Sequence, residues 1–193
     1  SGIINTHFIV AYMVMQHGTD AQKKDWLPRM ATGDLRGSFS MSEPGCGSDV
    51  SAIQSKAVRD GDGYVLNGQK MWLTNGGSSS LCAVLVRTDA EADDGASVYK
   101  KMSTFLIEKP AGFGEVLPGL TIPGKIEKMG YKGVDTTELV MTDFHLPADA
   151  LLGGLLAAGH SPSDIAVVEI SPARRDELIS AHPGVAVLSE PGP

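Results

Sequence analysis

Residues 64–73 carry the local pattern that most restricts how this chain can fold. Tyr64-Val65-Leu66 and the segment Gln69–Leu73 flank the dipeptide Asn67-Gly68. Asn-Gly between two apolar runs is typical of a type I′ turn, so the pattern predicts a β-hairpin. Short strands with Gly-rich turns are typical of a β-sandwich or β-barrel. Further strand-like segments cover 38–42, 51–59, 81–88, 103–108, 120–122 and 138–144.

Helical patterns precede these strands. Residues 3–15 are nearly all apolar in their second half, as in a helix that is buried on most sides. The run Thr19–Gln22 has the form of a capping box and predicts the start of a second helix, which Gly33 ends. The sequence therefore predicts N-terminal α-helices within 1–35 and a mainly β domain over 36–149.

Residues 150–193 differ from the preceding segment in the pattern of their predicted elements. Their α-β-α-β order is typical of a parallel sheet and fits poorly into an antiparallel barrel, so we expect a short α/β-like C-terminal tail. A polar, acidic stretch at 89–101 is expected to be a solvated loop. Because the chain begins inside a helical pattern without a methionine, we also expect it to be a piece of a longer protein. Within and just before the tail, helical character is predicted at 148–158 and 172–180, and strands at 164–169 and 185–188.

Charge and cysteine content narrow the classes of partner. The 193 residues include 16 basic and 23 acidic side chains, which give a formal net charge of −7. This balance disfavours nonspecific binding to nucleic acid or to an anionic membrane, and no apolar run reaches the ~18 residues of a transmembrane helix. Cys46 and Cys82 are expected to be free thiols in a reducing compartment. No Cys/His cluster has metal-ligand spacing, so the sequence predicts a soluble protein without a metal site.

A glycine-containing loop follows the first predicted strand. The sequence Ser42-Glu43-Pro44-Gly45-Cys46-Gly47-Ser48-Asp49 places glycines among hydroxyls and a carboxylate. Glycines let backbone N–H groups approach an anion or a polar ring edge closely. Ordinary turn chemistry explains the same residues. The loop is neither a Walker loop nor a G-x-G-x-x-G fingerprint.

Trp72 and Thr74 form a second chemical signal. Two residues apart in a strand, they are expected to point to the same face. A flat indole beside a hydroxyl donor suits a planar heteroaromatic cofactor, because it offers a stacking wall and a hydrogen bond to the ring edge. The alternative interpretation is a core tryptophan beside a solvent-facing threonine.

Taken together, the loop 41–49 and the segment 67–77 resemble the middle domain of the acyl-CoA dehydrogenase family. Residues 16–33 resemble the last helices of that family's N-terminal domain, and 128–130 and 135–147 resemble the closing strands of its β domain. The resemblance covers about residues 1–153. It implies non-covalently bound FAD, removal of an α-proton from an acyl-CoA thioester and transfer of the β-hydride to flavin N5. It also implies a homo-oligomeric parent that passes electrons to an electron-transfer flavoprotein.

The resemblance assigns cofactor-binding roles residue by residue. Met41 and Ser42 would meet the pyrimidine side of the flavin, Trp72 would flank the ring, and Thr74 would donate a hydrogen bond near N5. Ser48 would contact FAD or the CoA portion of the substrate. The full set of implied cofactor-binding residues is Phe39, Met41, Ser42, Gly47, Ser48, Trp72 and Thr74.

No catalytic residue is assigned, because the family's base is a glutamate on a C-terminal helical domain to which nothing here corresponds. Glu43, Glu108 and Glu138 are possible substitutes, but each lies in a motif where the family has no base. The isolated chain is therefore expected to be inactive. Alternatives are an acyl-CoA oxidase or flavin monooxygenase relative, in which reduced flavin meets oxygen, and a non-catalytic flavin-binding module.

The tail resembles an N-terminal piece of pyrroline-5-carboxylate reductase, over a helix and a strand of a dinucleotide-binding unit. Such a unit needs a Gly-rich turn to hold the pyrophosphate. The segment 144–149 stands in that place and contains no glycine, so no NADP binding is expected. Arg174 and Arg175 are expected on a solvated helix face. For the whole protein we expect a cytoplasmic location of bacterial type rather than the mitochondrial matrix.

Overall fold

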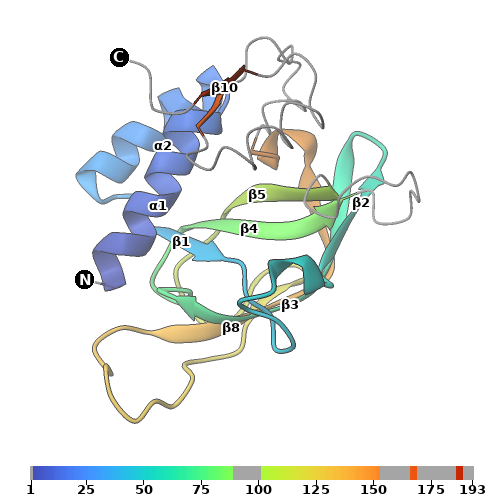
Figure 1. Cartoon of the computed structure of the whole chain (residues 1–193). Coiled ribbons are helices and arrows are strands. Elements are labelled where there is room, and N and C mark those ends of the chain that lie inside the picture. The colour runs from blue at the N-terminus through green and yellow to red at the C-terminus, as the bar shows by residue number, and fades with distance from the viewer. Residues whose placement is uncertain (1, 89–100, 153–165, 169–185, 189–193) are drawn as a thin grey trace. The chain divides into compact units, whose positions relative to one another are not determined.

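The computed structural model describes residues 2–88, 101–152, 166–168 and 186–188 (Figure 1). The chain divides into two compact units, Ser1–Leu152 and Gly153–Pro193. In the second unit, β9 (Ala166–Val168) pairs in parallel with β10 (Ala186–Leu188). The predicted strands of the tail are therefore present and parallel. The predicted loop at 89–101, apart from its last residue, and the predicted helix at 172–180 lie outside the described residues.

Two helices begin the first unit, as predicted. α1 spans Gly2–His17 and α2 spans Asp20–Thr32. The capping box is confirmed: the Gln22 N–H donates to Thr19 Oγ1 (3.2 Å), and the Thr19 N–H donates to Gln22 Oε1 (3.0 Å). Gly33 ends α2 in a left-handed conformation (φ 84°) that favours glycine. No helix in the described ranges is long and apolar enough to cross a membrane.

A curled eight-stranded sheet forms the rest of the first unit, which confirms the mainly β prediction. Its order is β1-β4-β2-β3-β8-β7-β6, and β5 pairs with β4. β1 and β2 run parallel to β4, whereas the other pairs are antiparallel. The strands are β1 (Gly37–Ser40), β2 (Lys56–Asp60), β3 (Gly63–Thr74), β4 (Leu81–Thr88), β5 (Met102–Glu108), β6 (Gly114–Leu117), β7 (Leu120–Ile122) and β8 (Thr136–Pro147).

The predicted hairpin at Asn67-Gly68 is wrong. β3 continues through both residues as one 12-residue strand that pairs with β8, with a bulge at this point. The Asn67 side chain donates to Asp143 Oδ1 (3.1 Å) and accepts from the Asp143 N–H (2.9 Å). The chain instead reverses at Gly61-Asp62, between the paired residues Asp60 and Gly63. Pairing along a long partner strand outweighs the local turn preference of Asn-Gly.

Three other segments differ from the sequence expectation. The strand expected over 51–59 begins at Lys56, because a 3₁₀ turn occupies Val50–Ala52. β6, which pairs with β7, has no counterpart among the predicted strands. The helix expected from residue 148 is a single 3₁₀ turn at Ala148–Ala150 within the described residues.

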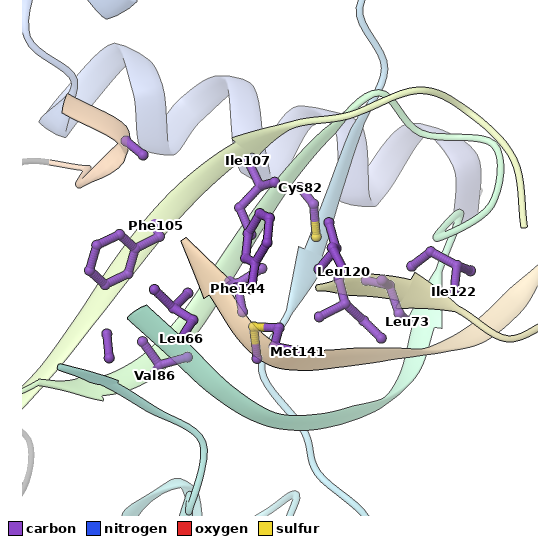
Figure 2. Packing of buried hydrophobic residues seen from close by; sticks show 14 residues of the cluster. Leu66, Leu73, Cys82, Val86, Phe105, Ile107, Leu120, Ile122, Met141 and Phe144 are labelled. Atoms are coloured by element: carbon purple, nitrogen blue, oxygen red, sulfur yellow. The ribbon is translucent and has the colours of Figure 1, made fainter. Parts of the chain in front are cut away.

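Two apolar clusters hold the first unit together. The sheet cluster fills the space that the strands enclose. Figure 2 shows that it gathers Leu66 of β3, Phe105 of β5, and Met141 and Phe144 of β8. Cys82 belongs to the same cluster, and burial raises the pKa of its thiol to about 11. The helix-side cluster packs α1 and α2 against the sheet and consists of Val10, Val14, Met30, Leu35, Leu81, Ala83, Leu106 and Leu152.

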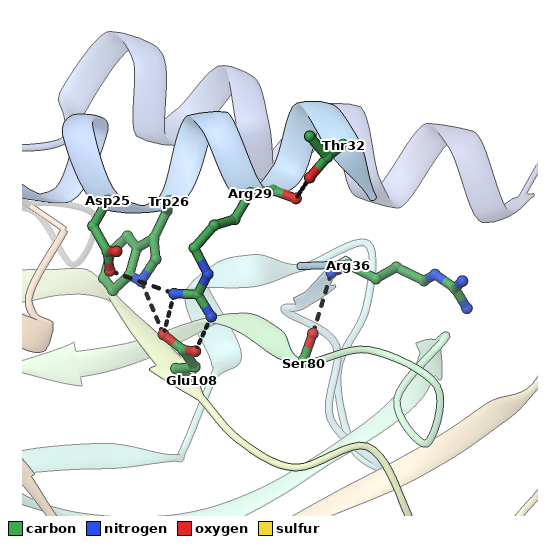
Figure 3. A network of polar contacts seen from close by, with 7 residues as sticks. All are labelled: Asp25, Trp26, Arg29, Thr32, Arg36, Ser80 and Glu108. Atoms are coloured by element: carbon green, nitrogen blue, oxygen red, sulfur yellow. Dashed lines mark hydrogen bonds and ion pairs between the residues drawn. The ribbon is translucent and has the colours of Figure 1, made fainter. Parts of the chain in front are cut away.

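Polar contacts join α2 to β5 at the edge of the helix-side cluster (Figure 3). Arg29 donates to both carboxylate oxygens of Glu108, and the Trp26 indole N–H donates to Glu108 Oε2 (3.1 Å). The hydrogen bond from Arg29 lowers the pKa of Glu108 below its ordinary value. These exposed contacts link α2 to β5 beside the buried packing of the helix-side cluster.

Candidate functional site

One backbone hydrogen bond brings the two predicted chemical segments together. The Met71 N–H donates to the Ser42 carbonyl oxygen (2.9 Å). Met41 and Ser42 follow the end of β1, and Trp72 follows Met71 in β3. The structure thus places the Met41-Ser42 segment next to the segment that carries Trp72, although 30 residues separate Ser42 from Trp72 in the sequence.

Trp72 lies in a bulge of β3. The pairing with β8 shifts between Lys70 and Leu73, and Trp72 has a left-handed backbone (φ 64°) that non-glycine residues rarely adopt. Its side chain is 57% exposed, whereas Leu73 is fully buried. Trp72 is therefore not a core residue of the described unit. Thr74 follows on the same strand and is half-buried, so an indole and a hydroxyl are both available to a ligand.

The loop after Ser42 is open. Glu43 and Cys46 exchange two backbone hydrogen bonds (2.8 and 3.2 Å), which closes a tight turn. Gly47 and Ser48 are exposed beyond it. A Cβ atom on Gly47 would come within 4 Å of Ser42 Oγ alone (3.8 Å). A large ligand can therefore reach the backbone of this loop.

Phe39 has a different environment from the other predicted site residues. It lies in β1, pairs with Ala83 and packs against the helix-side cluster. The structure brings the Met41-Ser42 segment next to Met71, the neighbour of Trp72. It places Thr74 on the same strand as Trp72 and leaves Gly47 and Ser48 on the open loop.

A buried ion pair beneath the site has no counterpart in the sequence predictions. Lys70 is fully buried, and its Nζ donates to Glu43 Oε1 (2.8 Å) and to the Met41 carbonyl oxygen (3.1 Å). Burial lowers the pKa of Lys70, and Glu43 opposes that shift. Burial alone would raise the pKa of Glu43, but hydrogen bonds from Lys70, Ser55 and the Gln54 amide hold it below its ordinary value. In the sequence, Lys70 stands between the polar Gln69 and the apolar run Met71–Leu73, a position that does not mark it as buried.

The three glutamates considered as substitute bases are all engaged by other side chains. Glu43 pairs with Lys70, and Glu108 accepts from Arg29 and Trp26. Glu138 accepts a hydrogen bond from Gln69 Nε2 (2.7 Å). Each carboxylate therefore has a structural partner.

The arrangement suits a flat ring with polar edges. Ser42 and Thr74 make no side-chain hydrogen bond to another residue in the described ranges, so both hydroxyls can serve a ligand. The exposed indole offers an aromatic face, and the glycine-containing loop offers backbone near it. A planar heteroaromatic cofactor such as a flavin fits this set of donors and surfaces.

Two family models match the chain. Residues 38–144 match the acyl-CoA dehydrogenase middle domain, and residues 1–34 match the acyl-CoA dehydrogenase N-terminal domain. Among curated relatives, (2S)-methylsuccinyl-CoA dehydrogenase of Cereibacter sphaeroides is 38% identical over 154 residues, which are 78% of this chain and 27% of that protein. The mitochondrial isovaleryl-CoA dehydrogenase of Oryza sativa subsp. japonica is 39% identical over 72% of this chain and 32% of that protein.

Solved structures agree with these matches. An acyl-CoA dehydrogenase from Geobacillus kaustophilus superposes with a TM-score of 0.68 and 39% identity, over 75% of this chain and 36% of that one. A glutaryl-CoA dehydrogenase from Mycobacterium smegmatis, solved in complex with FADH2, gives a TM-score of 0.63 and 34% identity, over 77% of this chain and 35% of that one. The chain spans about a third or less of the length of these curated relatives. The two matching family models and the shared fold show that the chain belongs to the acyl-CoA dehydrogenase family.

Proposed function

We propose that this chain supplies the flavin-facing β surface of an FAD-dependent acyl-CoA dehydrogenase. The reaction is the α,β-dehydrogenation of an acyl-CoA thioester, in which a base takes the α-proton and bound FAD would supply N5 as the acceptor of the β-hydride. The observation that carries this proposal is the exposed indole of Trp72 in a left-handed bulge, next to Met71, whose N–H donates to the Ser42 carbonyl oxygen. A family relative solved with FADH2 supports the choice of cofactor.

Each residue of the site is proposed to contact a different part of the flavin ring. The Trp72 indole stacks beside the flavin ring, and Met41 and Ser42 face its pyrimidine side. The Thr74 hydroxyl donates a hydrogen bond near N5. Donors of this kind stabilise negative charge that builds up as a flavin is reduced. Phe39, although it packs against the helix-side cluster, is also proposed to come close to the flavin from the end of β1.

The open loop faces the nucleotide portions of the ligands. Gly47 and Ser48 contact FAD through the exposed backbone beyond the Glu43–Cys46 turn, and Ser48 also contacts the CoA portion of the substrate. Because a glycine here leaves open space, a bulky ligand can approach the chain without a steric clash.

We further propose that none of the three glutamates considered as substitute bases is the catalytic base, since Glu43, Glu108 and Glu138 are each held by another side chain. The chain alone then turns over no acyl-CoA. Incubation of the 193-residue protein with FAD and an acyl-CoA should leave the flavin absorbance unbleached. Bleaching at an enzymatic rate would place a base within these residues.

In the complete enzyme, the substrate is an acyl-CoA and the acceptor is an electron-transfer flavoprotein. The curated relatives named above are dehydrogenases, which supports dehydrogenation over an oxidase or a monooxygenase reaction. A prolyl acyl carrier protein oxidase is also among the similar structures. We also propose that the complete enzyme is homo-oligomeric, as the family resemblance implies, and that it acts in a bacterial cytoplasm; the similarity to the Cereibacter sphaeroides protein supports the bacterial type alone.

FAD titration of the full chain tests the proposal. The Trp26→Phe variant leaves Trp72 as the one tryptophan, and bound FAD should then quench its fluorescence. Trp72→Ala should weaken FAD binding by about tenfold or more, the loss expected for one aromatic stacking contact. Met129→Ala is the matched control, because this side chain is fully exposed. Quenching of Trp26 but not of Trp72, or equal FAD affinity in Trp72→Ala and the unmodified chain, would contradict the proposed site.

A further inference from the structure

Lys70 and Glu43 form an ion pair that the proposed function does not use. Their side chains are 0% and 7% exposed, and Nζ lies 2.8 Å from Oε1. Neither group therefore offers a surface to a ligand. A buried pair of this kind adds no net charge to the site above it.

The pair joins the separate segments of the proposed flavin site. Lys70 lies two residues before Trp72 in β3, and its Nζ also donates to the Met41 carbonyl oxygen (3.1 Å). Glu43 accepts from the Gln54 N–H (2.8 Å) and the Ser55 N–H (2.9 Å), just before β2. The two charged side chains thus connect the end of β1, the start of β2 and the middle of β3.

Stability alone does not account for this arrangement. Buried ion pairs can often be replaced by neutral or apolar side chains of similar size without loss of stability, whereas removal of one partner is costly. An apolar pair at positions 43 and 70 would pack, but it could not donate a hydrogen bond to the Met41 carbonyl oxygen. What the ion pair provides, and an apolar pair would not, is the hydrogen bond that holds Met41 in place.

We infer that Lys70 and Glu43 are positioning residues that hold the Met41-Ser42 segment at a set distance from Trp72. They act on the flavin through these residues and do not touch it. The inference rests on the proposed function for its effect on FAD, but the tie between the two segments exists in the chain by itself.

Paired substitutions separate positioning from stability. Lys70→Met and Glu43→Gln each leave one buried partner without its counter-charge, so both should be less stable. The Lys70→Met/Glu43→Gln double variant removes both charges and should recover most of the stability. Arg29→Met/Glu108→Gln is the matched control, because it removes an ion pair that lies between α2 and β5, away from the site.

FAD affinity is the first readout, measured in the full chain under conditions where every variant is folded. The double variant at 43 and 70 should bind FAD about tenfold or more weakly, the loss expected when a hydrogen bond from a charged donor disappears. The control double variant should bind FAD as the unmodified chain does. Recovery of both stability and FAD affinity in the double variant at 43 and 70 would overturn the inference.

Amide hydrogen exchange is the second readout and needs no FAD. In the double variant at 43 and 70, the Met71 N–H, which donates to the Ser42 carbonyl oxygen, should exchange about tenfold or more faster. Amides of β4 paired with β5, such as that of Val84, should be unchanged. Equal protection of Met71 in both proteins would overturn the inference.

Absence of FAD binding to the unmodified chain would count against the proposed function, while the exchange rates would still decide whether the pair holds the segment.

Discussion

Gly68 lies where β3 passes closest to the segment before β2. Its φ of 144° is one that side chains rarely adopt. A Cβ atom there would lie 2.2 Å from Ser55 Oγ and 2.6 Å from Ser55 Cα. Because Ser55 also donates its N–H to Glu43 (2.9 Å), a shift at this position would reach the ion pair beneath the site.

Gly68→Ala should therefore lower the free energy of unfolding by about 2–4 kcal/mol, because backbone strain adds to overpacking. Urea denaturation of the full chain measures the change. Gly124→Ala is the control, since a Cβ atom there meets nothing within 4 Å, and it should stay within about 0.5 kcal/mol of the unmodified chain. Equal stability of the two variants would show that the Ser55 segment moves freely.

The stability of the protein at acid pH tests the environments of two carboxylates, those of Glu43 and Glu108. The pKa values of Glu43 and Glu108 lie below the ordinary 4.5. For Glu43, burial raises the pKa, but the hydrogen bonds from Lys70, Ser55 and Gln54 outweigh burial. For Glu108, the hydrogen bond from Arg29 is the main cause of the lowered pKa. A group whose pKa is lower in the folded state stabilises the fold above its unfolded pKa and loses that contribution as the pH falls through the folded value.

The free energy of unfolding should thus fall as the pH drops below about 4.5. Urea denaturation between about pH 7 and pH 3 should show a shallower decline for Glu43→Gln than for the unmodified chain. Glu108→Gln should have a smaller effect that salt reduces, because the Glu108 side chain is 42% exposed to solvent. Parallel pH curves for Glu43→Gln and the unmodified chain would contradict the assignment of the buried pair as charged.

At the scale of the elements, His7 connects α1 with α2 and β1. Its Nε2 lies 3.1 Å from the Met30 carbonyl oxygen, and its Nδ1 accepts from the Gly37 N–H (3.1 Å). These contacts tie α1 to the last turn of α2 and to the first residue of β1, which Figure 1 shows beside α1. The neutral imidazole, with one donor and one acceptor nitrogen, fits both partners.

His7→Leu should cost about 1–3 kcal/mol of stability, because it leaves a backbone donor and a backbone acceptor without partners. Thermal denaturation followed by circular dichroism gives the change. His17→Gln is the matched control on the exposed end of the same helix and should be close to neutral. A loss of similar size in both variants would mean that helix propensity, and not the His7 contacts, sets the effect.

The elements also show what the sequence can and cannot predict. The capping box of α2 and the strands β4 and β5 follow from local patterns, since caps and apolar runs are local properties. The Asn67-Gly68 turn fails because the partner that keeps β3 straight is Asp143, distant in sequence. The sequence also reveals the aromatic and hydroxyl members of the site, Trp72 and Ser42. It does not reveal the Lys70–Glu43 pair, because lysine is ordinarily solvent-exposed and only the folded sheet shows that Lys70 is buried.

At the scale of the whole molecule, the end of the first unit carries more structure than its sequence suggests. The sequence predicts a domain end at residue 149. Leu152 belongs to the helix-side cluster and Ala150 to the sheet cluster. The Leu152 N–H donates to the Thr104 carbonyl oxygen (2.9 Å), and Leu151 bridges to Phe105. Residues 150–152 therefore contribute to both clusters.

Two truncations test where the unit ends. A chain that stops after Leu152 should keep the cooperative unfolding of the first unit, since both clusters are complete. A chain that stops after Asp149 should lose about 2–5 kcal/mol, the usual cost of removing a buried leucine. Urea denaturation of both proteins, beside the full chain, measures the difference. Equal stability of the two truncated chains would place the end of the unit at 149.

The contact between α2 and the end of the β domain also constrains how the protein is made. Gln22 Nε2 donates to the carbonyl oxygens of Asp149 (2.7 Å) and Leu151 (3.1 Å), the latter 129 residues later in the chain. A ribosome adds about 5–20 residues per second, so this partner appears on the order of ten seconds after Gln22. The strands that carry Leu81, Ala83 and Leu106 of the helix-side cluster are made before that point, so the helices can already pack on part of the sheet. Only the closing contacts with residues 149–152 have to wait, and the first unit should reach its full stability after Leu152 has been synthesised.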